Sequence, residues 1–185
     1  MPKTPGSLLD RLREQPNPHD WQQFVKLFSP ILFRWVRRFG VAENDVEDVL
    51  QELFILLFKR LASFVVDPNK SFHAWLWTVT RNFVYDWQER TRPPLPAEFL
   101  EQLAAPDEVS AEESREFARI LVERGLAIIQ NDFQPNTWAV FLAVAIEKRS
   151  GAEVARQYHM TANAVYLTYS RVLYRLRTEL TGFWE

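Results

Sequence analysis

The chain has 185 residues, of which 47% are hydrophobic and 25% charged, so it is expected to fold into one or two compact domains and cannot be disordered throughout. Cysteine is absent, which excludes disulfides and thiolate metal sites. No run of about 18 apolar residues occurs and the first residues are too polar for a signal peptide, so we expect a soluble, cytoplasmic protein.

The net charge of −2 conceals a pattern along the chain. Residues 1–92 carry 13 Lys and Arg against 11 Asp and Glu, residues 93–135 carry 3 against 9, and residues 136–185 carry 6 against 4. Two mildly basic ends therefore flank an acidic middle, which fits ends that bind a polyanion. An acidic linker that keeps the chain soluble would produce the same numbers.

The first long element is predicted between Trp21 and Phe39, where apolar residues recur at the i, i+3 and i+4 spacing of an amphipathic helix. Pro30 should kink this helix or begin a second one, and Gly40 should end it. Asn44 is then a plausible N-cap for the next helix, with Glu47 at the position that a capping box uses.

The helix after Asn44 is expected to run to about Leu61, followed by a loop at residues 65–70. Ser71 should cap a long helix that ends near Arg92. The prolines at 93, 94 and 96 stop that helix, and we interpret residues 93–113 as an acidic interdomain linker.

A second helical set follows at about 114–130, 136–148, 151–158 and 162–180, and no useful β-alternation appears. The predicted fold class is therefore all-α, with two small helical domains at residues 1–92 and 114–185.

A catalytic or metal site is not expected. The three histidines lie in different predicted elements, and no nucleophile elbow, Walker loop, dinucleotide fingerprint or zinc-ligand spacing occurs. Asp45, Asp48 and Glu52 share one helix face, but favourable charge at the positive end of a helix, or a protein-contact surface, explains them better than a metal does. We predict no enzyme and no cofactor.

Near the C-terminus, the helix around Val154 and Ala155, a turn at residues 159–161 and the helix from Ala162 have the spacing of a helix-turn-helix. Thr161 should cap the second of these helices. The residues expected to face DNA are Asn163, Tyr166, Thr168 and Tyr169, and Arg171, Arg175 and Arg177 extend a basic stripe beyond them. A plain helical hairpin is the structural alternative.

The predicted helix of residues 71–92 interleaves aromatic with polar and basic residues, as a surface for single-stranded nucleic acid would. Part of this pattern is a core stripe, formed by Phe72, Trp75, Leu76, Val79 and Phe83. The candidates expected to be exposed are Trp77, Arg81, Asn82, Tyr85, Gln88 and Arg90.

Three segments together resemble bacterial RNA polymerase sigma factors of the sigma-70 family. Residues 45–54 (DVEDVLQELF) are similar to the acidic D-x-x-D-x-x-Q-E-x-F signature of region 2, and residues 71–82 (SFHAWLWTVTRN) to the F-x-x-W-L-x-x-[IV]-x-R-N stretch that follows it. The helix-turn-helix with residues 170–177 (SRVLYRLR) is similar to region 4. Two regions and one linker are the layout of the extracytoplasmic-function group.

The resemblance implies a non-enzymatic promoter-specificity subunit. Region 2 would dock on the β′ clamp of core RNA polymerase through Asp45, Asp48, Gln51 and Glu52. It would bind and open the −10 promoter element through Arg60, Phe64, Trp77, Arg81, Asn82, Tyr85, Gln88 and Arg90, with an extruded base held between Phe64 and Asn82 and Arg60 at the rim.

Region 4, with the β flap of the polymerase as its partner, would read the −35 element through Asn163, Tyr166, Thr168, Tyr169 and Arg171, with Arg175 and Arg177 on phosphates. An anti-sigma partner is expected by analogy. Two alternatives stay open, namely a helix-turn-helix regulator that binds duplex DNA without polymerase and a helical interaction module.

Overall fold

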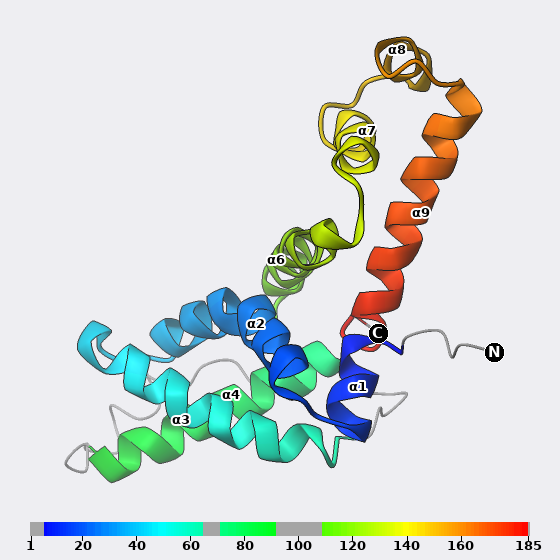
Figure 1. The fold of residues 1–185 in the computed structure, drawn as a ribbon. Helices are drawn as coiled ribbons and strands as arrows, with labels where there is room; N and C mark the ends of the chain where they lie inside the picture. Colours follow the sequence, from blue (N-terminus) through cyan, green and yellow to red (C-terminus); the bar gives the residue numbers. More distant parts are fainter. Residues whose placement is uncertain (1–5, 65–70, 92–108, 185) are drawn as a thin grey trace. The chain divides into compact units, whose positions relative to one another are not determined.

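A computed structural model describes residues 6–64, 71–91 and 109–184, and all regular structure in these residues is helical (Figure 1). This confirms the all-α fold class. The elements are α1 (Leu8–Glu14), α2 (Pro18–Arg38), the short 3₁₀ helix η1 (Glu43–Asp45), α3 (Val46–Leu61), α4 (Phe72–Thr91), α6 (Ala111–Ile129), η2 (Gln130–Asp132), α7 (Pro135–Ala145), α8 (Gly151–Gln157) and α9 (Ala162–Leu180).

Helix α2 is continuous from Pro18 to Arg38, so no second helix begins at Pro30. The apolar face on both sides of the proline is buried, including Phe28 and Ile31, and this packing offsets the hydrogen bond that proline cannot donate. The predicted stop is confirmed, because Gly40 follows the helix in the left-handed region at φ +86°.

The predicted start of helix α3 is wrong and that of helix α4 is right. Asn44 lies inside the short helix η1, and Asp45 precedes α3 without a side-chain capping bond. By contrast, the Ala74 N–H donates to Ser71 Oγ at 3.1 Å, as the predicted N-cap requires. The predicted loop at residues 65–70 lies outside the described residues.

The chain divides into two compact units. The first consists of residues 1–121 and 181–185, and the second of residues 122–180. These limits differ from those of the expected domains, because the contacts of the first half of α6 and of the last residues are made with the first unit. Of the expected linker, residues 109–113 are described, and Glu113 among them is buried.

The first unit has an aromatic core between helices α2 and α4, with α3 packed against both. Phe28 lies at its centre, with its ring centroid 5.5 Å from Phe72, 4.6 Å from Phe24 and 5.1 Å from Phe183. Helix α1, which the sequence pattern did not predict, adds Leu8, Leu9 and Leu12 to this core and begins with a capping box at Ser7.

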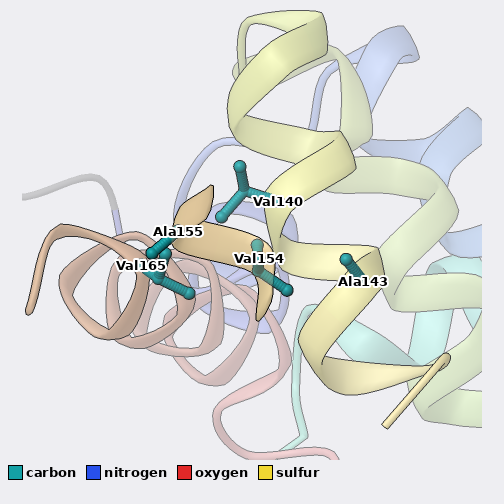
Figure 2. Packing of buried hydrophobic residues seen from close by; sticks show 5 residues of the cluster. All are labelled: Val140, Ala143, Val154, Ala155 and Val165. Atoms are coloured by element: carbon teal, nitrogen blue, oxygen red, sulfur yellow. The ribbon is translucent and has the colours of Figure 1, made fainter. Parts of the chain in front are cut away.

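The second unit has a smaller, aliphatic core where α7, α8 and α9 meet. Figure 2 shows its five central side chains, which are Val140, Ala143, Val154, Ala155 and Val165. The turn between α8 and α9 passes through His159 at φ +53°, and the Ala164 N–H donates to Thr161 Oγ1 at 3.1 Å. The two helices, the turn between them and the Thr161 cap are therefore as predicted.

Candidate nucleic-acid and polymerase interface

The N-terminal half of α3 presents an exposed polar surface, which we call the acidic face and define as Asp45, Asp48, Gln51 and Glu52. Asp48, Gln51 and Glu52 are exposed, and Asp45 is half-buried. The opposite side of the helix is buried through Val46, Val49, Leu53 and Leu57. The amphipathic pattern therefore fixes which side chains face outward.

The acidic face forms only a weak ion pair with a neighbouring helix. Glu52 lies 3.6 Å from Arg90 of α4, but both side chains are at least half exposed, so this pair contributes little to stability. In the described part of the chain, no three histidine or carboxylate side chains gather to hold a metal ion. The exposed carboxylates of Asp48 and Glu52 give this face a negative charge.

An apolar strip, defined as Trp21, Phe54, Ile55 and Phe58, continues the acidic face along α3. Ile55 is 58% exposed and Phe58 47% exposed. The Trp21 ring meets Phe58 edge-on at 5.0 Å and Phe54 at 6.1 Å. Sequence reasoning missed this strip as a surface, although Ile55 and Phe58 lie at the spacing that an exposed stripe requires.

A cleft of about 570 Å³ lies between helices α3 and α4. It is lined by Leu56, Arg60, Val79, Asn82, Phe83, Tyr85, Asp86 and Arg90. Four of the predicted −10 residues, Arg60, Asn82, Tyr85 and Arg90, are thereby brought to one site. The cleft combines aromatic surface, an amide and two guanidinium groups, which suits a nucleotide base and its phosphates.

Two further predicted −10 residues, Arg81 and Gln88, are half-buried and are not among the residues that line the cleft. The Arg81 guanidinium lies 3.4 Å from Asn82 Oδ1, so the two side chains position each other. Gln88 Nε2 donates to the carbonyl oxygen of Phe39 at 3.0 Å, which satisfies the end of helix α2. Gln88 therefore has a structural role in this state.

The expectation that Trp77 is exposed is wrong. Its side chain is 1% exposed and lies edge-on against Trp35 at 5.0 Å and Phe39 at 4.9 Å. Arg38 lies over the indole ring at 5.6 Å from its centroid. Helix α2 covers a wider face of α4 than the apolar spacing indicated, so the indole belongs to the core.

Phe64 is also placed in the core, 7% exposed, with its ring 4.7 Å from Trp75 and 5.4 Å from Phe72. It is not among the residues that line the α3–α4 cleft, so the described residues do not bring it together with Asn82 in that cleft. Arg60 and Asn82 do share the cleft, as expected.

Helix α9 presents the predicted −35 residues unequally. Asn163, Tyr166, Arg171 and Arg177 are exposed, and Thr168 and Tyr169 are half-buried. Tyr169 stacks on Phe141 at 5.8 Å, so part of its ring packs within the unit. Leu167 and Tyr174, which were not predicted, are 59% and 66% exposed.

Arg175 is paired with two carboxylates of the second unit. It is half-buried, 2.9 Å from Asp132 Oδ2 and 2.6 Å from the buried carboxylate of Glu179. Its expected contact with a DNA phosphate would compete with these two carboxylates.

One histidine of the first unit is electrostatically unusual. His73 is stacked on Phe117 at 4.0 Å and on Trp35 at 5.5 Å, and burial lowers its pKa from 6.5 to about 4, with the nearby Glu113 carboxylate acting in the opposite direction. The imidazole is therefore neutral at pH 7. It belongs to the core and lies outside the α3–α4 cleft.

Comparison with known proteins finds a family model that matches most of helices α2 to α4. Residues 24–93 match the model of sigma-70 region 2. This segment holds the acidic face and the α3–α4 cleft, and it is similar to region 2 of the sigma-70 family.

Two curated relatives match the same part of the chain. The RNA polymerase sigma factor CnrH of Cupriavidus metallidurans is 34% identical over 70 residues, which are 38% of this chain and 36% of that protein. The RNA polymerase sigma factor NccH of Alcaligenes xylosoxydans xylosoxydans is 33% identical over 78 residues, 42% of this chain and 41% of that protein. The chain thus spans about two fifths of the length of these relatives.

A solved structure of CnrH in complex with the cytosolic domain of CnrY is 25% identical and covers 91% of this chain and 92% of its own. The TM-score of 0.38 is too low for a comparison of the two folds. In the described residues, no helix is both long and apolar enough to cross a membrane.

Proposed function

We propose that the chain is an RNA polymerase sigma factor of the extracytoplasmic-function group, which directs core polymerase to promoters in the cytoplasm and catalyses no reaction of its own. The observation that carries this proposal is the position of the family match. Residues 24–93 contain both an exposed acidic face and a cleft with basic and aromatic walls, and helix α3 contributes to both. One helix can thus connect polymerase docking to DNA binding.

The acidic face is the proposed contact with the β′ clamp of core polymerase. Asp48 and Glu52 are exposed, and the pair between Glu52 and Arg90 lies on the surface, so basic side chains of the clamp can compete for these carboxylates. The apolar strip beside it, with Ile55 and Phe58, adds surface whose burial stabilises a complex by about 25 cal/mol per Å².

The α3–α4 cleft is the proposed site of the −10 element. Its volume of about 570 Å³ accommodates a base and its sugar, with Asn82 to hydrogen-bond the base edge and Tyr85 to stack on it. Extruding a base costs on the order of a few kcal/mol, which base capture offsets. Promoter melting then needs binding energy and no ATP.

The second unit is the proposed reader of the −35 element, on the β flap of the polymerase. Asn163, Tyr166 and Arg171 are exposed on the first turns of α9, where a recognition helix contacts base edges. Arg177 lies further along the same helix, at a position suited to phosphate contact. Arg175 would join it only after leaving Asp132 and Glu179.

A protein inhibitor that covers the apolar strip is also proposed as a partner. When the polymerase is absent, exposed apolar side chains such as Ile55 and Phe58 favour binding of another protein that buries them. Pull-down from host extract with the polymerase-free chain tests this proposal, with the Ile55→Ser variant as control. Recovery of the same amount of partner protein with both chains would contradict it.

Transcription by core polymerase on a pool of genomic promoters tests the proposal. We expect promoter-specific transcripts only when the chain is added, and their loss in the double variant Gln51→Ala and Glu52→Ala. A matched control, Glu112→Ala with Gln130→Ala, changes two exposed side chains elsewhere and should keep activity. A chain that shifts duplex DNA tightly without polymerase, and never stimulates core enzyme, would instead be a stand-alone regulator.

A further inference from the structure

Helix α8 begins at a glycine that is covered by an aromatic side chain of helix α9. A β-carbon added to Gly151 would lie 2.8 Å from Tyr166 Cζ and 2.9 Å from both Tyr166 Cε2 and the hydroxyl oxygen. Apart from neighbouring residues of the chain and the backbone of α8, these are the three nearest atoms. Because Cζ is the closest of the three, the face of the ring, and not its edge, lies over the glycine.

The ring of Tyr166, and not the backbone conformation, requires glycine at this position. Gly151 is the first residue of α8 and follows the N-cap Ser150. In the described residues, the glycines with positive φ are Gly40 and Gly182, so alanine would fit the backbone at Gly151 without strain. Its β-carbon would instead approach the ring far more closely than the roughly 3.5–4.0 Å at which two carbon atoms make contact. A side chain on Gly151 would therefore displace Tyr166.

The packing on Gly151 fixes a side chain that is still open to a ligand. Tyr166 is 55% exposed, although one face of its ring covers the glycine. Asn163, one turn earlier, and Ser170, one turn later, are exposed on the same side of α9. Tyr166 thus lies in the middle of the surface that we propose to contact the −35 element.

We propose that Gly151 is a specificity-determining residue of the second unit, because it holds Tyr166 in one orientation for contact with the −35 element. The inference rests on the proposed function. Gly151 acts as a positioning residue, and the ring of Tyr166 makes the contact with DNA. A side chain that is already fixed in the free chain loses less conformational entropy on binding. It also cannot turn away from a base pair whose edge does not fit it, so such a base pair is rejected.

NMR of the free chain tests the packing of the ring. One α-proton of Gly151 points in the direction of the missing β-carbon and therefore faces the ring of Tyr166, whose ring current moves its resonance upfield. Tyr166→Ala should return this resonance downfield. Leu167→Ala is the matched control, because it removes the next exposed side chain of α9 and should leave the resonance in place. An unchanged Gly151 resonance in Tyr166→Ala would overturn the packing and the inference.

Transcription with Gly151→Ala tests the effect on specificity. With core polymerase and a promoter library randomised over the −35 element, the preference for the best base over the worst should fall roughly five- to tenfold at one or two positions. Thermal stability should be kept, because the displaced atoms are the far end of an exposed side chain. The matched control Ala152→Ser also adds one atom, at the next and exposed position of α8, and should keep the wild-type profile.

The double variant distinguishes an effect through Tyr166 from a general change in α8. Tyr166→Ala alone should weaken the same base preferences, and adding Gly151→Ala to it should change nothing further, because no ring is left to displace. No effect of Gly151→Ala, or an equal effect with and without Tyr166, would overturn the inference and leave the sigma-factor proposal intact. A wild-type chain that never stimulates core polymerase would overturn the proposed function, and this inference with it.

Discussion

The two units use their aromatic residues differently, although Trp138 and Phe141 are buried in the second unit as well. In the first unit, Phe28, Trp35, Phe72 and Trp77 are buried in one continuous core. The centre of the second unit is built from valine and alanine, whereas Tyr166 and Tyr174 of α9 are exposed. Small core residues let α8 approach α9 closely, and they leave the large side chains of α9 available for a ligand. We call the first unit the platform and the second unit, which carries the proposed −35 helix, the reader.

Loss of side-chain volume in the core should lower the unfolding free energy more in the platform than in the reader. Phe28→Ala removes a fully buried ring that contacts Phe24, Phe72, Phe117 and Phe183, and we expect a loss of about 3–5 kcal/mol in unfolding free energy. Urea unfolding followed by tryptophan fluorescence measures it, because only one tryptophan, Trp138, lies in the second unit.

Phe33→Ala is the matched control in the same helix, since this side chain is 49% exposed. It should change the unfolding free energy by less than about 0.5 kcal/mol. A Phe28→Ala chain as stable as the control would show that the aromatic core does not hold the platform together.

The stability of the platform should depend on pH through His73. The pKa of His73 is lowered to about 4 in the folded chain from an ordinary value of 6.5, so the unfolded chain binds the proton more tightly. The neutral, buried His73 contributes its full share to the unfolding free energy above pH 6.5. This contribution, which amounts to about 3 kcal/mol, is lost as the pH falls from 6.5 to 4.

His73→Phe keeps the ring stack with Trp35 and Phe117 and removes the titration. The difference in unfolding free energy between the two chains should therefore grow in favour of the variant as the pH falls from 6.5 to 4. A constant difference over that range would contradict a neutral, buried imidazole.

A larger side chain in the core should lower the stability of the reader more than that of the platform. Ala155 is 8% exposed in the aliphatic core of the second unit, so Ala155→Leu forces α8 away from its neighbours at a cost of about 1–3 kcal/mol. Amide hydrogen exchange should show faster opening of α8 and α9, with α2 to α4 unchanged. Uniform loss of protection in both units would mean that they unfold as one.

The smallest expected effect concerns the junction between α2 and α4. Gln88→Ala removes the hydrogen bond from Gln88 Nε2 to the Phe39 carbonyl and should cost about 0.5–1.5 kcal/mol. Thermal unfolding measures this loss, with Glu89→Ala, an exposed neighbour, as the control. A change no larger than that of the control would leave Gln88 free to contact DNA.

Features fixed by local chemistry could be predicted from the sequence. The caps at Ser71 and Thr161 and the helix end at Gly40 depend on neighbouring backbone groups, and all three are confirmed. The motif around Asn82 also led to the α3–α4 cleft, because its resemblance to a known family carried spatial information that periodicity lacks.

Features fixed by distant partners could not be predicted. Trp77 was expected outside and Glu113 in a linker, and both are buried by contacts with Trp35 on helix α2. In an aromatic-rich helix such as α4, the spacing of apolar residues cannot tell which aromatic side chains are buried and which are exposed. The burial of Phe183 depends on contacts with residues more than a hundred positions earlier, such as Phe28, and the local sequence carries no signal for such contacts.

The most direct test of the account is transcription by purified core polymerase on a supercoiled promoter pool, with sequencing of the 5′ ends. The account predicts start sites that share paired upstream elements when this chain is present, and their disappearance when Gln51 and Glu52 are both replaced by alanine. Start sites identical with and without the chain, or unaffected by the double replacement, would contradict it.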